Sequence, residues 1–294
     1  MKCIDRERES LLNFKQGLID RSGMLSTWRD DGKNIDCCKW RGIQCNNERI
    51  GVRILDLRGS KMHFLTGSFN LTSLIDLENQ EYLDLSNNYD SSRTQLPQHM
   101  SSFKKLRYLN LSNVNFYGGI PYELGNMSKL EYLDLKGNSL NGAIPSQLGK
   151  LTSLRYLDLS VNYYLQGEIP YHLGNLSQLK YLNLGFTSLY GAIPFKVGNN
   201  PLLSTLRLGG NFDLTINGAK WLSSLSLLTT LGLDSLNNLA YSRHWLQMIS
   251  ELIPNLRGLS LVRCSISDKD VSSLFLSHSN LSTSLAMLDP LIIC

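Results

Sequence analysis

Leucine recurs along this chain at a nearly constant interval. Leu133 is matched by Leu109 and Leu157, each 24 residues away, and the series continues at steps of 25 and 24. Its further members, some at looser spacing, are Leu55, Leu83, Leu182, Leu206, Leu231, Leu259 and Leu288. A fixed period in this range indicates a solenoid of stacked repeats, for which we expect one continuous core rather than two ordinary domains.

Each copy follows the template Leu-x-x-Leu-x-Leu-x-x-Asn, which is the leucine-rich repeat pattern. Its central alternation predicts a short parallel strand with the leucines facing the core. Four repeats then carry a glycine two residues before an Ile-Pro pair, as in 142–145, which predicts an extended return segment instead of a long helix. We assign the template's asparagine, whose buried amide would bond to neighbouring backbone, to Asn115, Asn138, Asn162 and Asn211, with Cys264 in its place in the ninth repeat.

The first 51 residues have a different character. Ile4, Leu11, Phe14 and Leu18 fall on one face of a helix, and a solenoid needs a terminal unit to cover its first repeat. The segment also carries four cysteines, Cys3, Cys37, Cys38 and Cys45. Adjacent cysteines rarely bridge each other, which leaves two pairings, and we favour Cys3 with Cys37 and Cys38 with Cys45.

A disulfide framework competes with a zinc site for these four cysteines. The spacing lacks the paired C-x₂-C units of zinc sites, so we expect no metal. Each disulfide would contribute about 2–4 kcal/mol to stability, and disulfides indicate an oxidising compartment outside the cytoplasm. The helix and its disulfides therefore predict an N-terminal cap.

Composition and the chain ends complete the domain prediction. We expect the cap at 1–51, about nine repeats and a partial tenth at 52–289, and a truncated tail at 290–294. The net charge of +4 and 42% hydrophobic content favour a soluble protein without a nucleic-acid partner. No apolar run approaches the roughly 18 residues of a membrane helix, and the charged start does not resemble a secretory signal, so the sequence predicts neither feature.

Two rows of side chains are expected on the exposed face of the parallel strands, because equivalent residues stack about 4.8 Å apart. The position before the central leucine is tyrosine in five successive repeats, and the position after it is mostly acidic. Tyrosine side chains suit ligand recognition, although tyrosine at this position could also be present only because it packs well in a strand. Charged residues that differ between repeats are better candidates for ligand specificity. The candidate ligand-binding residues are Tyr82, Tyr108, Tyr132, Asp134, Lys136, Tyr156, Asp158, Tyr181, Arg207 and Asp234.

Five Asn-x-Ser/Thr sequons fit a secreted glycoprotein, with their acceptors at Asn70, Asn110, Asn126, Asn175 and Asn280. Asn126 and Asn175 lie in equivalent return turns and are the best candidates, whereas a glycan on Asn110 would cover the inner face. The five histidines occupy unrelated repeat positions with no recurring nucleophile or metal-type partner. We therefore predict no enzyme activity and no cofactor.

The cap also carries a resemblance. The segments Cys3 to Lys15, Leu25 to Trp28 and Asp36 to Cys45, combined with the Gly-x-Ile-Pro repeats, resemble plant leucine-rich repeat receptor-like proteins, most closely the ethylene-inducing xylanase receptor group. The resemblance implies an α/β repeat fold, a curved right-handed superhelix with a parallel inner sheet, a second small sheet and a disulfide-stapled helical cap. It also implies the cysteine pairing favoured above.

The function that this resemblance implies is a ligand-binding ectodomain at the extracellular face of the plasma membrane. Such a protein perceives defence or developmental signals through a peptide, glycan or protein ligand, together with an adaptor receptor kinase. Two alternatives remain: a secreted protein like the polygalacturonase inhibitors, which share the cap and the repeats, or a truncated, non-functional receptor fragment.

Overall fold

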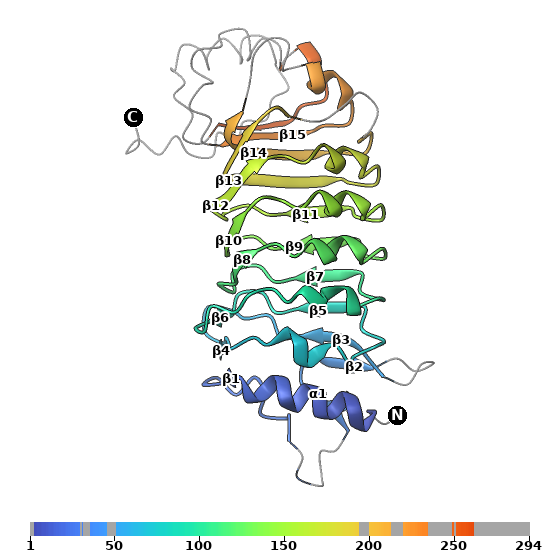
Figure 1. The fold of residues 1–294 in the computed structure, drawn as a ribbon, viewed down its shortest axis with the longest axis vertical. Helices are drawn as coiled ribbons and strands as arrows, with labels where there is room; N and C mark the ends of the chain where they lie inside the picture. The colour runs from blue at the N-terminus through green and yellow to red at the C-terminus, as the bar shows by residue number, and fades with distance from the viewer. Residues whose placement is uncertain are drawn as a thin grey trace. The chain divides into compact units, whose positions relative to one another are not determined.

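The computed structural model describes residues 3–29, 31, 36–45, 51–193, 200–212, 220–234, 249 and 251–261. The chain divides into two compact units, an N-terminal unit (Met1–Leu140) and a C-terminal unit (Asn141–Cys294). Each unit is built from repeats in which a short strand is followed by an extended or 3-10 return segment (Figure 1).

The N-terminal unit contains a sheet with one strand per repeat. Parallel strands β3 (Val52–Asp56), β5 (Tyr82–Asp84), β7 (Tyr108–Asn110) and β9 (Tyr132–Asp134) follow one another, and β2 (Ile43–Cys45) pairs antiparallel with β3 on the cap side. The register aligns Leu55, Leu83, Leu109 and Leu133, all fully buried. The leucine period thus becomes a column of core side chains.

The C-terminal unit repeats this arrangement. Its parallel strands are β11 (Tyr156–Asp158), β13 (Tyr181–Gly191), β14 (Thr205–Phe212), β15 (Thr230–Asp234) and β16 (Gly258–Ser260). Leu157, Leu182, Leu206, Leu231 and Leu259 are aligned in register. The predicted leucine-rich repeat fold with parallel strands is confirmed.

A second set of short strands lies on the return path. In the N-terminal unit, β1 (Leu18–Ile19), β4 (Thr66–Gly67) and β6 (Tyr89–Asp90) form a three-stranded sheet, with β1 antiparallel and β6 parallel to β4. The remaining short strands are β8 (Tyr117–Gly119), β10 (Ser139–Gly142) and β12 (Tyr164–Glu168). Within the C-terminal unit, β12 pairs in parallel with residues 141–142 of β10 and with β13. The family resemblance implied such a second sheet.

The described return segments up to Ser224 contain short 3-10 helices. Three of them directly follow the proline of an Ile-Pro pair, and Gly118, Gly142, Gly167 and Gly191 all have positive φ angles of 74–96°. Glycine is needed here because other L-residues avoid this conformation. The helices are η2 (Leu71–Leu74), η3 (Gln98–Ser102), η4 (Tyr122–Asn126), η5 (Ser146–Lys150), η6 (Tyr171–Asn175) and η7 (Lys220–Ser224).

The cap consists of α1 (Asp5–Gln16), β1 and η1 (Cys37–Lys39). Leu11 and Phe14 are buried as predicted, but Ile4 lies before the helix and is exposed, while Leu18 belongs to β1. The helix is shorter than the apolar pattern suggested because Gly17 ends it. Disulfides join Cys3 to Cys37 and Cys38 to Cys45, the pairing that we favoured.

Buried asparagines tie successive turns together, but one sequence assignment was wrong. Asn88 Nδ2 donates to the backbone oxygens of Leu57 and Leu85, each at 2.8 Å, and Asn138 makes equivalent bonds to Leu111 and Leu135. The repeat between them places fully buried Val114 at this position, so Asn115 is one residue too late and Asn88 had been missed. Asn162 Nδ2 likewise donates to the backbone oxygens of Leu159 and Ser160. The Asn211 side chain is not described, and Cys264 lies outside the described residues.

Candidate functional site

The predicted tyrosine row exists, and its rings stack on one another. In the N-terminal unit the ring centroids of Tyr82 and Tyr108 are 4.1 Å apart, and those of Tyr108 and Tyr132 are 4.2 Å apart. In the C-terminal unit Tyr156 and Tyr181 stack at 4.2 Å. All five are half-buried, because the strand spacing brings the rings face to face. The row therefore presents ring edges, while the faces contact the neighbouring tyrosines.

The acidic row is not exposed, which corrects the sequence prediction. Asp84 and Asp158 are only 1% and 2% exposed, and Asp134 is also buried. The Asp84 carboxylate accepts hydrogen bonds from Ser86 N at 3.0 Å and Ser86 Oγ at 2.6 Å, and Ser160 does the same for Asp158. These carboxylates close the turn after each strand. In the sequence we overlooked the serine two residues after the aspartate, whose hydroxyl can donate to the carboxylate and so indicates that this carboxylate is turned toward the chain.

The tyrosine hydroxyls are anchored to the same carboxylates. Tyr82 and Tyr108 both donate to Asp84 Oδ2, at 3.3 and 3.4 Å, and in the C-terminal unit Tyr181 donates to Asp158 Oδ2 at 3.2 Å. Burial and then the charge of Asp84 raise the pKa of Tyr82, and burial followed by the charge of Asp158 raises the pKa of Tyr181. Both phenols therefore remain neutral hydrogen-bond donors at physiological pH.

Two cations stand where other repeats have serine. Arg58 Nε and Nη2 lie 3.0 and 2.6 Å from the Asp56 carboxylate oxygens, and Nη2 also donates to Tyr82 Oη at 3.0 Å. The hydrogen bond to Asp56 raises the pKa of Arg58. Lys136 has an exposed side chain, and its backbone N donates to Asp134 Oδ1 at 3.0 Å. The N-terminal unit thus combines a tyrosine row with two cationic side chains at strand ends, of which Arg58 is paired with Asp56 and Lys136 is exposed.

A hollow of about 550 Å³ lies where β3, β5 and β7 end, beside Arg58. Three asparagines contribute to it, and Asn113 Nδ2 donates to Asn87 Oδ1 at 2.9 Å. Its lining is Gly59, Ser60, Lys61, Phe64, Asn87, Asn88 and Asn113. Amides, a lysine and ring edges can bind a polar, partly aromatic ligand but provide no nucleophile with a base.

The register of the C-terminal unit aligns Arg207 with Asn183 and Asn183 with Asp158, so Arg207 continues the row that contains Asp158. Arg207 is half-buried in β14, and Asp234 ends β15 with a side chain that is not described. Among the sequons, Asn126 and Asn175 are exposed at the ends of η4 and η6, and Asn70 is exposed before η2. Asn110 is buried, and its amide donates to Asp84 and Tyr108, so a glycan cannot be accommodated there. Asn280 lies outside the described residues.

The part of the chain that the structure describes holds no cluster of three histidine, cysteine or acidic side chains suited to a metal ion. Within the same residues, no helix combines the length and apolar character that crossing a membrane requires.

Comparison with known families supports the repeat assignment. A model of the leucine rich repeat N-terminal domain matches residues 4–46, and leucine rich repeat models match residues 105–127 and 122–163. The chain is 42% identical over 131 residues to receptor-like protein EIX1 of Solanum lycopersicum, and 41% identical over 128 residues to EIX2 of the same species. The resemblance to plant receptor-like proteins is confirmed. These matches cover 41% and 40% of this chain but only 12% of each relative.

Solved structures show the same fold over most of the chain. The ectodomain of the Arabidopsis thaliana receptor kinase GASSHO1/SCHENGEN3, in complex with CASPARIAN STRIP INTEGRITY FACTOR 2, aligns with a TM-score of 0.73 at 28% identity. It covers 91% of this chain and 31% of that one. The Arabidopsis receptor kinase HAESA ectodomain, in complex with an IDA peptide hormone lengthened at its N-terminus, aligns with a TM-score of 0.71 at 28% identity over 90% of this chain and 42% of that one.

Proposed function

We propose that this chain is the ligand-binding ectodomain of a plant cell-surface receptor-like protein that perceives a defence or developmental signal and has no catalytic activity. The similarity to receptor-like proteins and to two receptor ectodomains, one of them bound to a peptide hormone, supports this proposal. The matches span only 12% of the length of these curated relatives, so a part in signalling is itself proposed for this chain.

The observation that carries the proposal is the tyrosine row of the N-terminal unit. Its three rings stack on one another, and their hydroxyls donate to Asp84 or, for Tyr132, to Asp134, so little side-chain entropy is lost when a ligand binds. Lys136 adds an exposed positive charge at a strand end that carries serine in other repeats, whereas Arg58, at the equivalent strand end of β3, is paired with Asp56. The ligand that fits is an extended peptide with acidic residues.

The same comparisons support a proposed partner and location. Another solved structure contains HAESA with its peptide hormone and the co-receptor SERK1, and it supports the fold at 23% identity. By analogy, an adaptor receptor kinase would bind once the ligand is in place. The exposed Asn126 and Asn175 would carry glycans on the extracellular side.

Selection from a random dodecapeptide display library tests the proposal. The immobilised chain should enrich sequences that combine acidic and aromatic residues, and calorimetry should give saturable binding of the corresponding synthetic peptide. Lys136→Ala removes an exposed charge without opening the core, so it should weaken binding about 3- to 10-fold.

Lys129→Ala is the matched control, because Lys129 is also exposed but lies after η4, on the return side. It should leave binding unchanged. If no peptide binds saturably, or if both lysine variants bind like the unsubstituted chain, the main-sheet face is not the ligand site.

A further inference from the structure

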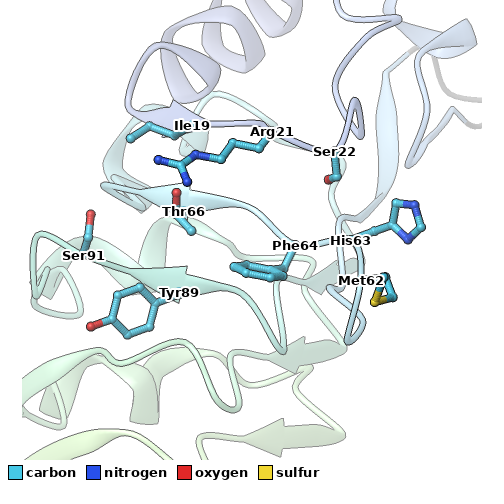
Figure 2. A pocket seen from close by; sticks show the side chains of 9 residues that line it. All are labelled: Ile19, Arg21, Ser22, Met62, His63, Phe64, Thr66, Tyr89 and Ser91. Atoms are coloured by element: carbon cyan, nitrogen blue, oxygen red, sulfur yellow. The ribbon is translucent and has the colours of Figure 1, made fainter.

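The three-stranded sheet β1–β4–β6 carries a second hollow, separate from the tyrosine row. The register aligns Ile19 with Thr66 and Thr66 with Tyr89, which places these three side chains in one row across the sheet. Their strand neighbours Gly67 and Asp90 are buried, so the row faces outward. The hollow over this row measures about 600 Å³, and Figure 2 shows its lining: Ile19, Arg21, Ser22, Met62, His63, Phe64, Thr66, Tyr89 and Ser91.

The hollow gathers large apolar side chains that are poorly covered. Ile19 and Tyr89 are each 52% exposed, Met62 is 80% exposed and Phe64 is 43% exposed. They come from the cap, from the loop before β4 and from β6, and meet only in the folded chain (Figure 2). A cluster of this kind marks a binding surface more often than isolated exposed residues do.

The lining of the hollow contains the guanidinium of Arg21 and no acidic side chain. Arg21 is exposed, and within the described residues its guanidinium has no hydrogen-bond or ion-pair partner. Two acids adjoin lining residues in sequence, and both accept backbone hydrogen bonds: Asp20, next to Arg21, accepts from Met24 N and Leu25 N at 2.9 and 2.7 Å, and Asp90, between Tyr89 and Ser91, accepts from Ser92 N and Thr94 N at 2.8 Å. Arg21 is therefore available to an external carboxylate.

The dimensions of the row select an extended ligand. Three neighbouring strands span about 10 Å, since strands lie about 4.8 Å apart, and three residues of an extended peptide at about 3.3 Å each cover the same distance. The lining side chains remain too exposed to enclose a small molecule, whose surface is mostly buried in a typical pocket. A short segment of a larger chain fits this open surface better.

We propose that this hollow binds an extended apolar–acidic–apolar segment of a partner protein. The central carboxylate pairs with Arg21, whose planar guanidinium matches a carboxylate in two parallel hydrogen bonds. One flanking apolar side chain contacts Phe64 and Met62, and the other contacts Ile19 and Tyr89. The hydroxyls of Thr66 and Ser91 lie in the same lining and can bond to the segment's backbone. Phe64 also lines the hollow at the ends of β3, β5 and β7, whereas Ile19, Arg21 and Tyr89 line this one alone of the two.

The probe is a blocked peptide of five residues, N-acetyl-glycine-phenylalanine-glutamate-leucine-glycine amide, which has no terminal carboxylate. Binding to the whole chain is measured by NMR titration, together with the same peptide carrying glutamine in place of glutamate. We expect saturable binding of the glutamate peptide and about fivefold weaker binding of the glutamine peptide.

Variants localise the interaction. Arg21→Gln should weaken binding of the glutamate peptide about fivefold and leave binding of the glutamine peptide unchanged, because only the glutamate peptide has a carboxylate that can pair with Arg21. Arg41→Gln, another exposed arginine of the cap outside the hollow, should change neither. Met62→Ala should weaken the binding of both peptides. Since Met62 is largely exposed, this variant should keep the melting temperature of the unsubstituted chain.

Several outcomes would overturn the proposal: no saturable binding of the glutamate peptide, equal binding of both peptides, or equal effects of Arg21→Gln and Arg41→Gln. If free phenylpropionate competes more strongly than the peptide, the ligand is a small aromatic acid instead of a protein segment. Lys136→Ala should leave this binding unchanged, so failure here is distinguishable from failure at the main sheet.

Discussion

Among single residues, Tyr108 does most to hold the tyrosine row of the N-terminal unit. Its ring stacks on Tyr82 on one side and on Tyr132 on the other, and its hydroxyl donates to the buried carboxylate of Asp84. Such a residue has two roles that are hard to separate, because the ring that shapes the surface also packs the strand. Substitution can separate them only if the ring and the hydroxyl are removed one at a time.

Tyr108→Ala should lower the free energy of unfolding by about 1–3 kcal/mol, since two ring contacts worth about 0.5–1.5 kcal/mol each are lost. Tyr108→Phe keeps both contacts and loses one hydroxyl, so its cost should be smaller. Urea denaturation followed by circular dichroism measures both. Tyr164→Ala, at an exposed tyrosine of β12, should stay within about 0.5 kcal/mol. Equal costs at Tyr108 and Tyr164 would mean that the stack adds no stability.

Among the secondary-structure elements, α1 shows how a polar contact joins the cap to the repeats. Glu7 is buried on the inner side of the helix, and its carboxylate accepts a hydrogen bond from Val52 N at 3.0 Å, at the start of β3. Nearby, Ser10 donates to Asp76, and Arg6 forms an ion pair with the same carboxylate. Burial raises the pKa of Glu7 above its ordinary value, although the Val52 N–H opposes this shift.

This raised pKa predicts a pH-dependent contribution to stability. The folded chain holds the proton on Glu7 more tightly than the unfolded chain, so the contribution is complete below the ordinary pKa and is lost as pH rises through the folded pKa. Glu7→Gln cannot ionise and keeps an acceptor for Val52 N. Relative to the unsubstituted chain, the variant should therefore become more stable from pH 4 to pH 7, as measured by urea midpoints.

Glu9→Gln serves as the control, because Glu9 lies on the same helix with an exposed side chain. Its stability relative to the unsubstituted chain should change little over this range. A difference between Glu7→Gln and the unsubstituted chain that stays constant with pH would show that Glu7 titrates normally in the folded protein.

For the chain as a whole, the cap and its disulfides determine how the repeat array begins. The Cys3–Cys37 bridge closes a loop with a separation of 34 residues, whereas Cys38–Cys45 closes one of 7. In the chain-entropy model the longer loop restricts the unfolded state more. The two disulfides should therefore differ in what they contribute, although both belong to the same small cap.

Replacing Cys3 and Cys37 by alanine should cost about 4 kcal/mol of unfolding free energy, and replacing Cys38 and Cys45 about 2.5 kcal/mol. Chemical denaturation of the two double variants under identical oxidising conditions gives the comparison. The reverse order would show that native contacts, such as the full burial of Cys37, outweigh the loop term.

Much of the fold could be predicted from the spacing of equivalent residues in successive repeats. Leu109 and Leu133 lie at equivalent positions and are both fully buried, and Gly142 adopts the positive φ that its place before Ile144-Pro145 suggested. The tyrosines could be placed in a row for the same reason. The prediction failed at Val114 and Asn115, which are adjacent. Residue spacing alone did not show which of the two side chains points into the core.

What the sequence by itself determined is the repeat and its core: a regular leucine spacing leaves few ways to bury the apolar residues, and the described repeats from Leu55 to Leu231 all bury the leucine at this position. Exposure was decided only by the tertiary structure. Asp84 and Asp158 looked like surface charges, yet each is buried because the following serine and the neighbouring repeat supply its hydrogen bonds. Ile19, Phe64 and Tyr89 share one hollow for a similar reason: the second sheet aligns strands that no local pattern connects.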